Sequence, residues 1–293
     1  MTNCYTITYH ASLFFNALLR LPPMLSAARC ASQVLVVLMF WCTSAIAVSP
    51  ISILPSTHVL SLMVKEVTGD KHEPLLSTNV SPHDFSLKPS HVRRLQKAEL
   101  VVWFGPTIEP YLAKVMRQIP DDKQLIINQD LSASNYGGHP WTSPEYLLQG
   151  MQQLRQYTGQ AWNSQEWVQQ MTQLKVELAA STRDMSQKNQ GYLVYHDGIS
   201  AFETYFGLAH LASFTNADDQ PPGAQQLAII AQLDKDNKVA CILMDHEAQP
   251  KLVNAVIKSS VERIQIDILA TKSHSLMTYL TSLQKALLGC GHS

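Results

Sequence analysis

Four side chains of the types that bind transition metals stand in loops or at strand ends of this sequence. His83 lies in the turn-forming run Ser-Pro-His-Asp, and His139 lies in the loop Gly-Gly-His-Pro-Trp. His196 directly follows the apolar run 192–195, and Asp267 follows a second short apolar run. In open α/β sheets, ligands bind at the carboxyl ends of the strands. We therefore expect His196 and Asp267 at such an edge, with the two loop histidines able to reach it.

Three imidazoles and one carboxylate form a ligand set that suits zinc, which accepts nitrogen and oxygen ligands in tetrahedral sites. Asp84 and Asp197 follow His83 and His196 in the chain, and such carboxylates can accept the second ring N–H of a ligating histidine. The sequence contains no HExxH or CxxC spacing, P-loop, GxSxG elbow or dinucleotide fingerprint. Seven further histidines are expected at the surface or at helix edges: His58, His72, His91, His210, His246, His274 and His292.

The elements that must position these residues alternate between strand and helix. Short apolar runs at 51–54, 100–104 and 125–127 indicate strands. The segments between them indicate three helices: one at 57–67, one that begins after an N-cap at Ser90, and one at 108–117. Further strands are expected at 192–195, 211–215, 239–244 and 264–266. Such alternation predicts mostly parallel sheets covered by helices.

One long helix is expected between these two sets of strands. The segment 164–188 lacks Gly and Pro, and as a helix it would be roughly 37 Å long. We therefore predict an α/β protein with two lobes, 48–160 and 191–293, joined by a linking helix within 161–190.

The first 47 residues have the features of a signal peptide. They contain no Asp or Glu, they carry the apolar run 34–41, and they end in Ala45-Ile46-Ala47, an A-x-A cleavage signal. The run is shorter than the about 20 residues that span a bilayer. We expect cleavage after Ala47 and export, with translation starting at Met1 or Met24.

Charge and cysteine content narrow the function further. The chain of 293 residues has a formal charge of −1, and cleavage would leave 20 basic and 23 acidic residues. Proteins that grip nucleic acid through its phosphates usually carry a basic surplus, so that class is disfavoured. Only Cys241 and Cys290 would remain after cleavage, and two thiols in an oxidising compartment usually pair. Two unpaired buried cysteines are the alternative.

Several ordered motifs resemble one known family. They are Ser81-Pro82-His83-Asp84-Phe85-Ser86-Leu87-Lys88-Pro89-Ser90, Leu100 to Pro106, His139-Pro140-Trp141 with Ser143-Pro144, Tyr195-His196-Asp197 with Phe206-Gly207-Leu208, and Pro222-Gly223-Ala224-Gln225 with Cys241, Asp267 and Cys290. From about Leu54 to Cys290, the chain resembles the periplasmic zinc-binding proteins of high-affinity zinc ABC importers. The match covers nearly the whole chain that follows the leader.

The resemblance implies two α/β lobes bridged by one long helix, with the metal in the cleft between them. By motif match, His83 and His139 would come from the first lobe, and His196 and Asp267 from the second. Manganese-type members carry a carboxylate at the position of His196, so the histidine implies zinc. The zinc branch also carries a disulfide that matches Cys241 and Cys290.

This sequence departs from the family pattern at three places, one of which, Asp245-His246-Glu247 after the first cysteine, is assigned no role. The segment 121–138 contains no histidine, whereas many zinc-branch members have a long His- and acid-rich loop there. The residues after Asp267 are Ile-Leu-Ala, without the Pro and Gly that usually follow this ligand in the family.

The implied function is capture of Zn²⁺, as cargo rather than as an enzymatic cofactor, and its delivery to an ABC permease of the inner membrane by a monomeric carrier. A manganese or iron carrier is one alternative, although such cations prefer more oxygen ligands. A secreted zinc hydrolase is another, with Asp84, Asp197 or Glu145 as its general base, and no motif favours any of them. A surface adhesin of the same fold would need an anchor, which the sequence does not indicate.

Overall fold

A computed structural model describes residues 51–78, 85–129, 138–215 and 222–291. The expected leader and the segment that carries His83 and Asp84 lie outside the described residues. Residues Ile51–Ser293 form one compact unit. None of the described helices is both long enough and apolar enough to cross a membrane.

The first lobe contains a three-stranded parallel sheet. Strands β1 (Ile53–Pro55), β2 (Leu100–Trp103) and β3 (Gln124–Ile126) lie in the order β1-β2-β3. Leu54 is paired with Val101, and Val102 with Leu125. Every residue of the central strand β2 is buried, as expected where helices cover both faces of a parallel sheet. The three strands therefore confirm the runs predicted from sequence.

Helices of the first lobe begin and end at recognisable signals. They are α3 (His58–Thr68), α4 (Pro89–Lys97), α5 (Pro110–Met116) and α6 (Pro144–Thr158), with short 3₁₀ turns η2 (Asp121–Lys123) and η4 (Pro140–Thr142). Thr57 accepts a hydrogen bond from the backbone N–H of Leu60 and caps α3.

The prediction of Ser90 as the N-cap of α4 was wrong. The helix begins at Pro89, and its N-cap is Lys88. Proline suits the first helical position because its fixed φ is already helical and its missing N–H has no intrahelical partner to lose.

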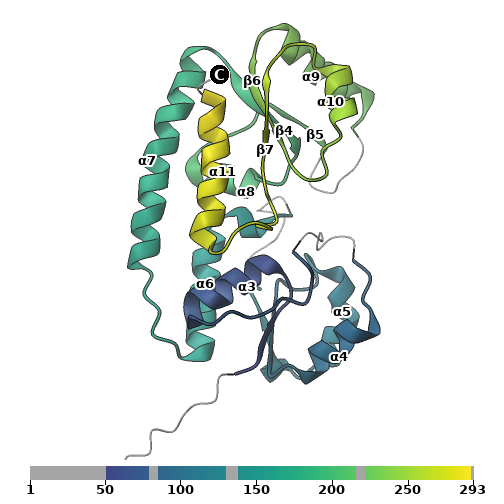
Figure 1. Ribbon diagram of the computed structural model, residues 1–293, viewed down its shortest axis with the longest axis vertical. Helices are drawn as coiled ribbons and strands as arrows, with labels where there is room; N and C mark the ends of the chain where they lie inside the picture. Colours follow the sequence, from purple (N-terminus) through teal and green to yellow (C-terminus); the bar gives the residue numbers. More distant parts are fainter. Residues whose placement is uncertain (1–50, 79–84, 130–137, 216–221, 292–293) are drawn as a thin grey trace, which may run out of the picture. The chain divides into compact units, whose positions relative to one another are not determined.

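Helix α7 (Gln165–Gln187) follows the first lobe in the chain and lies inside the range predicted for the linking helix. Its 23 residues give a length of about 34 Å. Trp167, Met171, Leu174 and Leu178 are buried at helical spacing along one side. Helix α7 lies alongside the C-terminal helix α11 (Leu276–Gly291), as Figure 1 shows.

The second lobe contains a four-stranded parallel sheet in the order β5-β4-β6-β7. Its strands are β4 (Gly191–His196), β5 (Ala212–Thr215), β6 (Val239–Met244) and β7 (Glu262–Gln265), and its remaining helices are α8 (Ser200–Phe206), α9 (Ala224–Lys235) and α10 (Pro250–Val256). The fold is therefore two α/β lobes with parallel sheets, as predicted.

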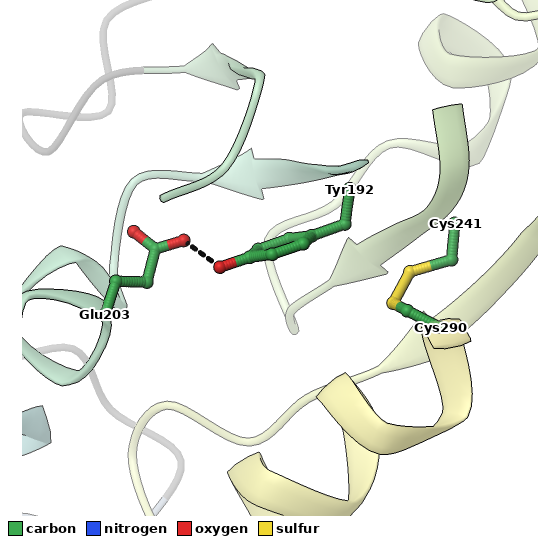
Figure 2. The surroundings of a disulfide bond; sticks show 4 residues. All are labelled: Tyr192, Glu203, Cys241 and Cys290. Atoms are coloured by element: carbon green, nitrogen blue, oxygen red, sulfur yellow. Dashed lines mark hydrogen bonds between the residues drawn. A yellow bond between two sulfur atoms is a disulfide. The ribbon is translucent and has the colours of Figure 1, made fainter. Parts of the chain in front are cut away.

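A disulfide ties α11 to the second sheet. Cys241 on β6 and Cys290 on α11 are bonded, with 5.2 Å between their Cα atoms (Figure 2). This bond confirms the predicted pairing over the alternative of two unpaired cysteines, and both residues are buried. Closing a loop of 49 residues stabilises a fold by about 4 kcal/mol on the chain-entropy model.

Candidate metal centre

The structure brings His139 and His196 together. His139 directly precedes η4 in the first lobe, and His196 is the last residue of β4 in the second. Their Nε2 atoms are 3.1 Å apart, and each residue is only 2% exposed. Two ring nitrogens about 3.3 Å apart fit one tetrahedral zinc ion with bonds of about 2.0 Å. The pair therefore has the spacing of two ligands of a single ion.

The position of His139 is fixed by the turn that follows it. Thr142 donates both its backbone N–H, at 3.1 Å, and its hydroxyl, at 3.0 Å, to the carbonyl oxygen of His139. The buried Trp141 donates its indole N–H to the carbonyl oxygen of Ile268 at 2.8 Å. That bond ties the His139 turn to the loop that carries Asp267.

Asp267 is engaged with its own loop. Its Oδ2 atom accepts hydrogen bonds from the hydroxyl of Thr271 at 2.9 Å and from the backbone N–H of Lys272 at 3.0 Å. The same loop meets α3, because Lys65 donates to the carbonyl oxygen of His274 at 3.0 Å. Asp267 therefore stabilises its own loop through these hydrogen bonds. Together with His83, which lies outside the described residues, it stays a predicted ligand.

A second cluster of possible metal ligands lies in the second lobe and follows His196 in the sequence. The ligand atoms of Asp197, Glu203 and His210 lie within 4.8 Å of one another, which is close enough to hold a cation. Glu203 is buried, and its carboxylate accepts a 2.6 Å bond from the hydroxyl of Tyr192 (Figure 2) and lies 2.9 Å from Nδ1 of His210. Because His210 offsets the charge of Glu203, we interpret the cluster as a buried ion pair.

The expectation that His210 is a surface or helix-edge group was therefore wrong. Its side chain is 17% exposed and pairs with a glutamate seven residues earlier. No helical or strand periodicity joins these two positions, because Glu203 lies on α8 and His210 lies in the turn before β5. The sequence carries no signal that would have identified the pair.

The ion pair predicts a pH-dependent stability. Burial lowers the pKa of His210, but the hydrogen bond and charge of Glu203, together with the charge of Asp197, outweigh burial and raise it. A raised histidine pKa stabilises the fold fully below about pH 6.5, and this contribution is lost as the pH rises through the folded pKa. We expect His210→Gln to lower the unfolding free energy by about 2 kcal/mol at pH 6 and by less at pH 8.5, as measured by urea denaturation. Equal losses at both pH values, or the same pattern in the exposed control His274→Gln, would contradict this assignment.

A second buried carboxylate supports the first lobe. Glu109 is fully buried, and its Oε2 atom accepts hydrogen bonds from the Ser56 hydroxyl at 2.9 Å and the Phe104 backbone N–H at 2.7 Å. Its Oε1 atom accepts the hydroxyl of Tyr111 at 2.6 Å. Burial raises the pKa of Glu109 to about 7, although these three bonds oppose that shift. Glu109 therefore joins the turn before α3 to the end of β2, and sequence reasoning did not identify it.

Comparison with known proteins places this chain in a family. Residues 53–288 match the family model described as zinc-uptake complex component A, periplasmic. The high-affinity zinc uptake system protein ZnuA of Yersinia pestis is 27% identical over 267 residues, which cover 74% of this chain and 83% of that protein.

Solved structures show the same fold. The AdcAII protein of Streptococcus pneumoniae superposes with a TM-score of 0.64 at 20% identity, covering 83% of this chain and 98% of that one. The periplasmic zinc-binding protein TroA of Treponema pallidum gives a TM-score of 0.63 at 14% identity, covering 82% of this chain and 98% of that one. Since the family match spans nearly all described residues, the chain belongs to the ZnuA family of periplasmic zinc-uptake proteins.

Proposed function

We propose that this protein captures Zn²⁺ in the periplasm and delivers it to an ABC-type zinc permease. The observation that carries the proposal is the pair of buried ring nitrogens, His139 Nε2 and His196 Nε2, which face each other at 3.1 Å from the two lobes. Family membership supports the transport role, because the named relatives are zinc uptake proteins rather than enzymes. A secreted zinc hydrolase has no such support.

We propose His83, His139, His196 and Asp267 as the ligands, with the ion held where the lobes 48–160 and 191–293 meet. The donor set fits zinc, since imidazole nitrogens are better ligands for zinc than for manganese, which prefers oxygen. Export by a cleavable signal peptide over 1–47 and a monomeric carrier complete the proposal. The low net charge gives no reason to expect a nucleic-acid partner.

Native mass spectrometry of the chain after Ala47 tests the metal and its stoichiometry. We expect one tightly retained zinc ion per monomer after titration, and loss of manganese under the same conditions. Retention of manganese in preference to zinc would favour the manganese carrier. Retention of neither ion would mean that the proposed function is wrong.

The role of Asp267 needs a separate test, because its carboxylate also holds its own loop. Asp267→Asn keeps an oxygen that can accept from Thr271 and Lys272 but removes the anionic ligand. We expect it to weaken zinc binding about tenfold or more in competition with a fluorescent chelator. Thr271→Val is the matched control, since it removes one loop bond and keeps the carboxylate. Equal effects of both changes would mean that Asp267 acts only through the loop.

A further inference from the structure

The strand register places a hydroxyl beside the ring of His196. In the parallel pair β4–β5, His196 is opposite Thr215, and these are the last residues of the two strands. The backbone N–H of Asp197 donates to the carbonyl oxygen of Thr215 at 3.2 Å, which extends the pairing beyond the strand ends. The Thr215 side chain is therefore held next to His196 by backbone bonds that do not involve its own hydroxyl.

The Thr215 hydroxyl has a single proton, and its position follows from its two neighbours. Thr215 Oγ1 lies 3.3 Å from the carbonyl oxygen of Tyr195 and 3.3 Å from Nδ1 of His196. A carbonyl oxygen can only accept, so the hydroxyl donates its proton to Tyr195. What remains on Oγ1 for the histidine is a lone pair, and Nδ1 of His196 must therefore be the donor.

This assignment determines which nitrogen of His196 is able to bind a metal. A neutral imidazole with its proton on Nδ1 has its lone pair on Nε2. Nε2 is the atom that faces Nε2 of His139 at 3.1 Å. The opposite tautomer would direct an N–H group toward the expected ion and would have to be converted before binding.

We propose that Thr215 is a positioning residue that fixes His196 as the Nδ1-protonated tautomer, so that Nε2 is ready to ligate the cargo ion. The inference rests on the proposed function, because it concerns His196 as a zinc ligand. Partners of this kind, which bond the second nitrogen of a ligating histidine, typically change metal affinity by 10- to 100-fold. Such a residue cannot be identified from sequence alone, since the pairing depends on strand register.

Two substitutions at Thr215 and one control test the proposal by zinc affinity. Thr215→Val keeps the branched shape and removes the hydroxyl, whereas Thr215→Ser keeps the hydroxyl. We expect Thr215→Val to weaken zinc binding by about 10- to 100-fold and Thr215→Ser to stay within about threefold of the wild type. The control is Thr172→Val on α7, which also removes a hydroxyl that donates to a backbone carbonyl, in an exposed position. Unchanged affinity in Thr215→Val would overturn the proposal.

The tautomer itself gives a readout that a purely structural role would not change. In the zinc-free wild-type protein, ¹⁵N-edited NMR of the imidazoles is expected to show His196 protonated at Nδ1, and Thr215→Val is expected to shift it toward the Nε2-protonated form. A wild-type His196 protonated at Nε2 would overturn the proposal even if Thr215→Val failed to fold.

Comparison with His196→Ala separates this inference from the proposed function. If His196→Ala loses zinc while Thr215→Val retains it, the positioning role is wrong and the zinc site stands. If His196→Ala binds zinc as the wild type does, the ligand assignment itself is wrong.

Discussion

Replacing His196 with Ala is expected to weaken zinc binding by about 10²- to 10³-fold. Structural zinc sites bind with roughly 10–16 kcal/mol, so one of three or four ligands accounts for about 3–4 kcal/mol. His196 Nε2 is one of the two nitrogens that face each other across the candidate site. Because the residue is buried, no water-exposed side chain can take its place without rearrangement. Competition with a fluorescent chelator of known zinc affinity measures the change.

The fold of the variant must be checked independently of metal binding. His196 lies at the end of β4, so we expect its replacement to leave the far-ultraviolet circular dichroism unchanged. Truncation of its buried ring leaves a cavity, and we expect a modest decrease in the zinc-free melting temperature. His274→Ala is the matched control, since it removes an exposed histidine whose backbone alone is bonded to α3. Zinc affinity within threefold of the wild type in His196→Ala would exclude this residue as a ligand.

The strands were predictable from sequence because both sheets are parallel. A strand buried on both faces has a continuous apolar run, and the runs at 100–104, 192–195 and 239–244 are of this kind. The long helix α7 was predictable for a related reason, since a stretch of 25 residues without Gly or Pro has few other stable conformations. The family resemblance then added the expectation that the metal lies between the two lobes.

Contacts between distant side chains were beyond sequence analysis. The pairing of Glu203 with His210 and the bonds of Asp267 within its own loop depend on turn geometry, which carries no periodic signal. The sequence predicted that His139 and His196 lie at the same edge of the fold, but not how close their rings are. Their 3.1 Å separation requires the register of β4 and the turn at η4, neither of which residue types determine.

Glu109 is buried in the structure, although its sequence context gives no indication of burial. In the sequence it is one acidic residue after a Gly-Pro turn, and acidic residues are rarely fully buried. In the structure it is 0% exposed and bonded to Ser56, Phe104 and Tyr111. No lysine or arginine bonds to it among the described residues. Burial without a cation is what raises its pKa to about 7.

A carboxyl group whose pKa is raised by folding makes stability fall as the pH rises. The contribution of Glu109 is fully present below its unfolded pKa near 4.5 and is lost as the pH rises through about 7. A shift of this size corresponds to a loss of about 3 kcal/mol between those two pH values. The loss is complete about one pH unit above 7, where the three hydrogen bonds stabilise the charged carboxylate.

Glu109→Gln imitates the neutral acid and should remove this pH dependence. Its amide oxygen can accept from Ser56 and Phe104, and its NH₂ group can donate to the Tyr111 hydroxyl. We expect the free energy of unfolding of Glu109→Gln, relative to the wild type, to rise by about 3 kcal/mol between pH 4.5 and pH 8 in urea denaturation of the zinc-free, disulfide-intact protein. Glu145→Gln, which changes an exposed glutamate in the same way, should show no comparable rise. A difference between Glu109→Gln and wild type that stays constant with pH would mean that Glu109 is not protonated in the folded protein near neutral pH.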